Sequence, residues 1–568
     1  VFFYNGPIAK AVAFERLLEN GETFARRLVD AFSDARRRPQ LVTVAVDGET
    51  FGHHHQFGEM ALAYGLHYIE SNDLARVTNY GEYLEKHPPV EEVQILERSS
   101  WSCPHGVERW RSDCGCDTGQ NPDWNQAWRT PLRESLDWLR DTVAPAFEEH
   151  ARPLVSDPWR ARDEYIHVIL DRSPESLATF IARQAGKELC ENERVTLLKL
   201  MELQRHAMLM YTSCGWFFDE VSRIETVQVM QYAGRVVQLA RELFGSDIEP
   251  QFLERLGQAI SNLAEHGTGR RIYERFVQPA MADLTTVAAH FAVRSLFEDY
   301  GSEAKVYCYD VAVSDLRRRE KGRARLAVGK IGLTSTITAE SGSFAFGALY
   351  FGEHTVRAGA TAFQNDDAYR QTAADLMERF EAADFAGTIH SLDRSFGTSA
   401  YSLKSLFKDE QRRTMGHILE GTLADIEKVF RQLYEHHYPP MRFLTEMGNP
   451  LPKPFKDAAE FIINTDLRRV LTAKEPNLAR VEALVSSATA WGAELDTEGH
   501  GYLLRLLLGR MMEAFASKPD EGEAIARLTA AVGLSQRLPF PIDLGEVQYR
   551  YYRLIPCSRE EHRAWAQA

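Results

Sequence analysis

The sequence predicts an α/β plus α protein in which an α/β region is followed by a helical domain, a small antiparallel sheet and a helical tail. Up to about residue 98, short runs of β-branched apolar residues alternate with helical periods, a pattern typical of parallel βα units. From about Thr130 to Glu298 the apolar spacing is almost wholly helical. Around residues 304–363 the period switches to two, and after Asp366 it is helical again. These changes predict domains over residues 1–150, 151–300, 301–366 and 367–568.

The composition is that of an ordinary globular protein. Of the 568 residues, 44% are hydrophobic and 26% are charged. The formal net charge is −15, so the protein repels a phosphate backbone and we expect no nucleic-acid partner. No stretch reaches the ~18 consecutive apolar residues of a membrane span, so we expect no membrane partner. The seven cysteines are sparse and odd in number, which disfavours a secreted disulfide framework and favours the cytoplasm.

The chain opens on an apolar run. Residues 1–4 read Val-Phe-Phe-Tyr and are followed by Asn5-Gly6, a pattern that predicts a strand running into a turn. The opening has neither an initiator Met nor the basic and cleavage regions of a signal peptide. We therefore expect the chain to be a fragment of a longer protein, with a processed natural N-terminus as the alternative.

Helices and short strands are predicted in turn over the first hundred residues. A helical period covers residues 8–38, and the apolar run Leu41–Val46 then predicts a strand buried on both faces. A second helix is predicted over Glu59–Glu70, followed by short strands near Arg76–Thr78 and Val93–Leu96.

The rest of the chain predicts a loop, a meandering sheet and further helices. Residues 99–128 form a long loop whose four Trp and three Cys favour an ordered, functional segment over a disordered one. Antiparallel strands with glycine turns are predicted at Val306, Ala324–Val328, Ile331–Ile337 and Phe344–Phe351. The clearest helices of the tail are predicted over residues 409–435, 477–492 and 500–517.

The strongest chemical signal follows the predicted strand Leu41–Val46. Asp47 and Glu49 come directly after it, and three histidines, residues 53–55, come next. In parallel α/β folds, ligands bind at the carboxyl ends of strands, so these side chains are candidates for a site. Two other interpretations stay open. Asp47 could cap backbone N–H groups in an Asp-Gly turn, or it could bind a metal together with His53 and His55.

The segment Asp47–His53 reads Asp-Gly-Glu-Thr-Phe-Gly-His and resembles the fourth signature region of glycoside hydrolase family 57. The resemblance implies that Asp47 is the general acid/base of a retaining α-glycosidase mechanism. It also implies that residues 1–150 are the C-terminal part of a seven-stranded-type βα barrel, the catalytic domain of the family. This sequence departs from the pattern at His54 and His55, where many members have aromatic residues, so the sugar subsite beside Asp47 differs.

Further segments resemble the same family. Residues 2–8 are similar to the strand before the fourth region, and Ser100-Trp101 with Trp110 resembles a Trp-bearing loop over the active site. Residues 210–220 resemble the fifth signature region, which brings Trp216 to the substrate, although Ser-Cys-Gly-Trp replaces the commoner Ser-Asp-Trp. The later residues resemble the uncharacterised C-terminal extension of a long subgroup. The substrate-binding residues implied by the resemblance are Glu49, His53, Trp101, Trp110 and Trp216, and simple loop or core packing is the alternative for the Trp residues.

The resemblance also implies a missing partner. In the family, the nucleophile is a Glu on a strand upstream of the segment that residues 1–8 resemble, and a retaining enzyme needs it ~5–5.5 Å from the acid/base. We therefore expect an α-glucan hydrolase or transferase, of amylase, 4-α-glucanotransferase or branching type, of which these residues alone are inactive. The expected partner is an α-glucan or oligosaccharide substrate, and no cofactor is expected. The rival functions are a metal-dependent polysaccharide deacetylase-like hydrolase and a non-catalytic glycan-binding or scaffold protein.

The loop 99–128 contains a second cluster of reactive residues. Cys103-Pro104-His105 and Cys114-Gly115-Cys116 offer three thiols and one imidazole, a ligand set that zinc accepts. Because Cys-x-Cys is an unusual spacing for zinc and paired Cys-x-x-Cys motifs are missing, the sequence favours plain loop thiols and predicts no metal. A zinc site and a disulfide or redox pair remain the alternatives.

Overall fold

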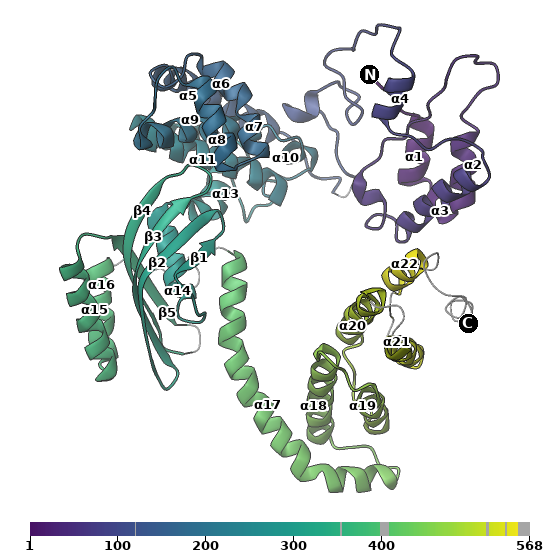
Figure 1. The fold of residues 1–568 in the computed structure, drawn as a ribbon, viewed down its shortest axis with the longest axis vertical. Coiled ribbons are helices and arrows are strands. Elements are labelled where there is room, and N and C mark those ends of the chain that lie inside the picture. The colour runs from purple at the N-terminus through teal and green to yellow at the C-terminus, as the bar shows by residue number, and fades with distance from the viewer. Residues whose placement is uncertain are drawn as a thin grey trace. The chain divides into compact units, whose positions relative to one another are not determined.

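A computed structural model of the chain describes residues 1–119, 121–352, 355–397, 408–517, 522–539, 542 and 544–554 (Figure 1). It divides into two compact units, Val1–Arg109 and Trp110–Ala568. The fold is mixed α/β: helices dominate, and one five-stranded antiparallel sheet contains all the named strands of the described residues. No helix in this part of the chain is both long and apolar enough to cross a membrane.

The first unit consists of short helices around a small core. Its α-helices are α1 (Gly6–Phe14), α2 (Gly21–Val29), α3 (Gly58–Ser71) and α4 (Tyr80–Lys86), with the 3₁₀ turns η1 (Leu17–Glu19) and η2 (Gly48–Thr50), and η3 (Glu108–Trp110) at its end. The core side chains Ile8, Val12, Leu18 and Phe24 are buried. Helices α2 and α3 approach closely at Gly65, where a Cβ would lie 2.8 Å from Cδ1 of Phe24.

The predicted strands of residues 1–150 are not present. Leu41–Val46 has no regular secondary structure and no ladder, and the described residues before Glu303 form only isolated bridges. The segment packs one face on the core, through Val42, Val44 and Val46, rather than being buried on both faces. A single backbone hydrogen bond, from Asn5 N to Thr43 O at 2.7 Å, joins it to the opening residues. Because a sheet needs several paired strands, one such bond leaves both segments irregular, and the βα barrel is not confirmed.

The opening Asn-Gly is a helix start, not a strand turn. The side chain of Asn5 accepts a hydrogen bond from Ile8 N at 3.1 Å, and Pro7 occupies the first turn of α1. Asn at the N-cap followed by Pro in the first turn is a strong signal for a helix N-terminus. The segments near Arg76–Thr78 and Val93–Leu96, which were predicted as strands, are also irregular.

The second unit begins with the loop up to Trp128 and then becomes helical, as predicted. Its helical region has one large core that contains Leu136, Phe147, Leu200, Trp216 and Met230. The helices are α5 (Arg129–Ala151), α6 (Pro158–Glu164), α7 (Ile166–Leu170), α8 (Pro174–Gln184), α9 (Glu191–Leu209), α10 (Cys214–Phe217), α11 (Ile224–Phe244), α12 (Glu249–Leu256), α13 (Gly269–Phe276), η4 (Gln278–Ala280) and α14 (Leu284–Arg294).

The predicted antiparallel sheet is confirmed, and helices cover both of its faces. The strands β1 (Glu303–Val306), β2 (Tyr309–Lys321), β3 (Ala324–Ser335), β4 (Ser341–Tyr350) and β5 (Val356–Ala362) pair in chain order. Helix α14 packs on one face, where Phe291 meets Phe346. Helices α15 (Asp366–Glu381) and α16 (Phe385–Phe396) pack on the other face, as Figure 1 also shows.

One predicted break in this sheet is wrong. The sequence predicts two strands separated near Gly329, whereas β3 is continuous from Ala324 to Ser335. Gly329 pairs with Phe346 of β4, and a Cβ there would lie 2.5 Å from Cζ of Phe346. The glycine therefore makes room for an aromatic ring inside the sheet instead of marking a turn.

The remaining chain is helical. Helix α17 (Lys408–Glu446) is followed by α18 (Lys453–Thr472), α19 (Leu478–Trp491), α20 (Thr497–Ser517), α21 (Gly522–Ser535) and α22 (Gly545–Leu554). The predicted helices 409–435, 477–492 and 500–517 correspond to α17, α19 and α20. Helices α18–α22 share a core of their own that includes Ile463, Leu484 and Leu508.

Candidate functional site

Residues 47–55 form a tight turn that is held by its own backbone. Asp47 precedes η2, and its carbonyl accepts a hydrogen bond from Thr50 N at 3.1 Å. The chain then folds back, because Gly52 N donates to His55 O at 3.0 Å. Gly52 has φ +108°, a conformation that residues with a Cβ rarely adopt. The local sequence thus fixes the shape of the turn.

The residues that anchor the turn differ from those that face solvent. Thr50 is buried, and Nε2 of His55 lies 2.9 Å from Ala13 O in α1. The side chains of Asp47, Glu49 and His53 are exposed. Asp47 makes no side-chain cap hydrogen bond to η2, so it does not act as the capping residue that one interpretation of the sequence expects.

The other candidate substrate residues lie in very different environments. Trp101 is 79% exposed in the loop before α5. Trp110 is half-buried and packs against the core of the helical region. Trp216 is 1% exposed, inside that core, so it would have to leave the core in order to stack on a sugar ring.

A hollow in the first unit lies beside the segment that leads to the turn. It has a volume of about 580 Å³, and its wall includes Phe3, Tyr4, Arg37 and Leu41. Asp47 is not part of this wall. The hollow combines aromatic rings with arginine side chains, but it does not contain the candidate acid/base.

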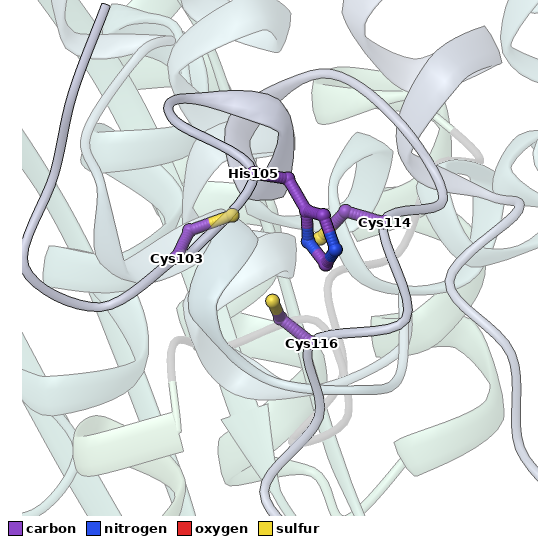
Figure 2. A group of neighbouring side chains, drawn as sticks. All are labelled: Cys103, His105, Cys114 and Cys116. Carbon is purple, nitrogen blue, oxygen red and sulfur yellow. The ribbon is translucent and has the colours of Figure 1, made fainter.

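The loop before α5 brings four potential metal ligands together. The ligand atoms of Cys103, His105, Cys114 and Cys116 all lie within 4.8 Å of one another. Figure 2 shows the four side chains turned toward a common centre. All four belong to one continuous stretch of 14 residues, from Cys103 to Cys116. In the described part of the chain, no other group of His, Cys, Asp and Glu is gathered in this way, and Asp47, His53 and His55 are not.

The loop is tied to the helical region through two buried polar residues that the sequence did not single out. Arg129, the first residue of α5, donates hydrogen bonds from its guanidinium to Cys116 O at 3.4 Å and to Phe218 O at 3.3 Å. The carboxylate of Asp219 accepts hydrogen bonds from the backbone N and the hydroxyl of Thr118. Phe218 and Asp219, which follow Trp216 in the segment that resembles the fifth signature region, therefore anchor the loop.

A second buried charge lies in the helical region. Glu202 of α9 is 1% exposed and accepts hydrogen bonds from Tyr165, Arg172 and Arg205 at 2.8, 2.9 and 3.0 Å. Burial alone would raise the pKa of Glu202, but the hydrogen bonds outweigh it and hold the pKa below its ordinary value. Glu202 also lines a cavity of about 440 Å³ that reaches Tyr309 of β2. Tyr165 and Arg172 lie outside α9, which holds Glu202 and Arg205, so no local motif could have identified the whole cluster.

The model of a family described as "Domain of unknown function (DUF3536)" matches residues 124–407, half of the chain. The match runs from the end of the loop through the helical region and the sheet to beyond α16. Neither the curated proteins nor the solved structures give a match.

Proposed function

We propose that this chain, which belongs to the DUF3536 family, is a carbohydrate-active protein that acts on α-glucan with retention, in the manner of glycoside hydrolase family 57. One observation carries the proposal. In the turn that resembles the fourth signature region, the residues that build the turn are buried or backbone-bonded, while Asp47, Glu49 and His53 face solvent. Exposed polar groups on a rigid turn are what a substrate site requires.

In the proposed mechanism Asp47 has two successive roles. Its carboxylic acid first gives a proton to the glycosidic oxygen, while the bond from that oxygen to the anomeric carbon breaks and a nucleophilic carboxylate attacks the same carbon. The Asp47 carboxylate then takes a proton from the water or sugar hydroxyl that displaces the nucleophile. Glu49 and His53 offer hydrogen bonds to sugar hydroxyls, and Trp101 offers an exposed ring for stacking.

The proposed mechanism also needs a nucleophile, which the resemblance implies is a Glu on a strand upstream of these residues. We propose that residues 3–5 and 41–46, which form no ladder in this structure and share one backbone hydrogen bond from Asn5 N to Thr43 O, become strands of a βα barrel when further strands lie beside them. Further strands beside them would complete the ladder and would bring a Glu close to Asp47. The odd number of cysteines favours the reducing cytoplasm as the compartment of this activity.

The test is an assay on maltooligosaccharides and amylose that follows both new reducing ends and redistribution of chain lengths. The 568-residue chain is compared with the same chain extended by any upstream sequence that its gene encodes. We expect turnover only from the extended chain, and loss of that turnover in Asp47→Asn. Asp34→Asn, at an exposed position in the same unit, is the matched control and should keep full activity.

The other outcomes distinguish the rival functions. Saturable binding of maltooligosaccharides by the extended chain without turnover would favour a glycan-binding protein. Removal of acetyl groups from a polysaccharide, with loss of this activity on chelation, would favour a metal-dependent hydrolase. Asp47-dependent turnover by the 568-residue chain would show that the nucleophile lies within these residues, so the role of the upstream strand would be wrong.

A further inference from the structure

We propose that Cys103, His105, Cys114 and Cys116 bind a zinc ion that holds the loop before α5 in shape. The proposal is independent of the α-glucan activity, because none of these residues belongs to the turn at Asp47. The first observation that supports it is that the four side chains come together: one ligand atom from each residue lies within 4.8 Å of the other three. Three thiol sulfurs and one imidazole nitrogen form a Cys₃His set, which is one of the usual structural zinc sites.

The separations are close to those of a bound ion. With Zn–S bonds of ~2.3 Å, tetrahedral geometry places neighbouring sulfurs about 3.8 Å apart. The observed limit of 4.8 Å therefore exceeds this separation by only about 1 Å, so each ligand atom needs to move toward the centre by less than about 1 Å. Rotation of the four side chains supplies such a movement, and Figure 2 shows them already facing one centre.

The backbone of the loop is built to present these ligands. Cys103, Pro104, His105 and Gly106 form a four-residue turn in which Gly106 N donates to Cys103 O at 3.1 Å. Pro at the second position and Gly at the fourth are typical of such a turn. Gly106 also has φ +82°, and a Cβ there would lie 2.4 Å from Arg98 O, so no other residue fits. The turn places the two N-terminal ligands side by side.

The second pair of ligands is shaped by another glycine. Gly115 lies between Cys114 and Cys116 and has φ +73°, a conformation that residues with a Cβ rarely adopt. Its position bends the chain between the two thiols, and both face the centre in Figure 2. The spacing Cys-Gly-Cys is therefore suited to one ion in this loop, although it differs from the commoner Cys-x-x-Cys.

The surrounding charge also fits a zinc thiolate centre. On binding, three thiols release their protons to solvent and neutral His105 donates a lone pair, so Zn²⁺ with three thiolates carries a net charge of −1. Arg129 is 0% exposed, and its guanidinium Nη1 lies 3.7 Å from Sγ of Cys114. A buried cation that donates to a ligand sulfur balances this charge and orients the ligand.

A structural role follows from the ligand count. Four protein ligands complete a tetrahedral zinc and leave no open position for substrate, which is the arrangement of structural rather than catalytic zinc. The described residues of the loop form no regular secondary structure beyond η3, and Cys103 is 2% exposed. The ion would thus supply the internal order that helices and strands supply elsewhere.

The test measures bound metal in the full chain purified under reducing conditions in zinc-containing buffer. We expect one zinc per chain by elemental analysis, and a tetrahedral thiolate absorption spectrum after replacement with Co²⁺. Cys114→Ser and Cys116→Ser should lose the zinc and the cobalt spectrum. Cys190→Ser is the matched control and should keep both, because Cys190 is the exposed N-cap of α9 and Ser is a preferred N-cap.

Several outcomes would overturn the proposal. These are a wild-type chain that holds no zinc after reconstitution, one that holds iron instead, and a Cys114–Cys116 disulfide that persists under reducing conditions. If the serine variants fail to fold, His105→Ala decides, since His105 lies toward solvent and its loss should lower zinc affinity while the helical circular dichroism is unchanged. Unchanged zinc affinity in His105→Ala would exclude the four-ligand site.

Discussion

The guanidinium of Arg129 lies against the sulfur of Cys114, with 3.7 Å between Nη1 and Sγ. The same side chain donates to Cys116 O and Phe218 O, and it is completely buried at the first turn of α5. One residue thus joins the proposed zinc ligands to the start of the helical region and to the segment after α10.

Arg129→Lys should weaken zinc binding without removing a ligand. A lysine ammonium cannot make the fork of hydrogen bonds that the guanidinium makes to two carbonyls and a sulfur. Loss of such an outer partner typically costs 10–100-fold in metal affinity, so we expect a decrease of about 10–100-fold in competition with a zinc chelator. Arg152→Lys, at the exposed C-terminal end of the same helix, should leave the affinity unchanged.

Glu202→Gln should strongly destabilise the helical region. Glu202 is buried among Tyr165, Arg172 and Arg205, and a neutral amide would leave the arginines without their counter-charge. Removing one partner of a buried ion pair typically costs about 3–5 kcal/mol, so the urea midpoint should fall markedly. Glu188→Gln, at an exposed position, should have no measurable effect.

The stability contributed by Glu202 should also depend on pH. The pKa of Glu202 in the folded protein is below its ordinary value of 4.5, which applies to the unfolded chain. The contribution is therefore complete above about pH 4.5 and is lost as the pH falls through the lower, folded-state pKa. Urea unfolding measured between neutral pH and acid should show a smaller loss of stability in Glu202→Gln than in the wild type. Equal slopes would contradict this.

Two glycines of the same strand should respond oppositely to alanine. In Gly329→Ala the new methyl group would lie 2.5 Å from the ring of Phe346, so overpacking should cost about 1–3 kcal/mol in unfolding free energy. Gly332→Ala meets only Ala312 Cβ at 3.8 Å and should be neutral or stabilising by up to about 1 kcal/mol. Urea denaturation of both variants checks the difference, and a similar loss in each would refute the role of the ring.

Azide should rescue Asp47→Ala if Asp47 is the acid/base. In a protein that turns over α-glucans, this change should lower the rate by about 10²–10⁴-fold. With an activated leaving group the first step needs no acid, and azide can then displace the nucleophile without base catalysis. The product should be a glycosyl azide of retained configuration, detectable by NMR. Absence of both rescue and azide product would argue against the role.

The elements that the sequence predicts well are those with a long, regular pattern. The helices around Leu136, Leu200 and Val236 follow the 3.6 period for three or more turns, and the sheet follows a period of two across four longer strands. The break expected near Gly329 was wrong because the sequence shows a glycine but not the ring of Phe346 opposite it.

The errors lie where short signals compete. Asn5-Gly6-Pro7 contains both a turn signal and a helix-capping signal, and the capping bond to Ile8 N decides for the helix. Leu41–Val46 has the composition of a buried strand, but composition cannot supply the neighbours that form a ladder. For the candidate site, the Cys and His residues were visible in the sequence, while their convergence depends on the conformations of Gly106 and Gly115.

The contacts of Arg129 and Asp219 determine how far the chain can be truncated from its N-terminal side without loss of stability. The family match starts at Trp124, yet several hydrogen-bond partners of these two buried charges lie earlier, at Cys114, Cys116 and Thr118. A chain trimmed to Trp124 would keep every helix of the match, but a guanidinium and a carboxylate in its interior would lose hydrogen bonds worth about 1–3 kcal/mol each. The smallest stable piece that contains the helical region therefore starts before Cys114, and trimming past that point should convert a well-folded segment into a protease-sensitive one.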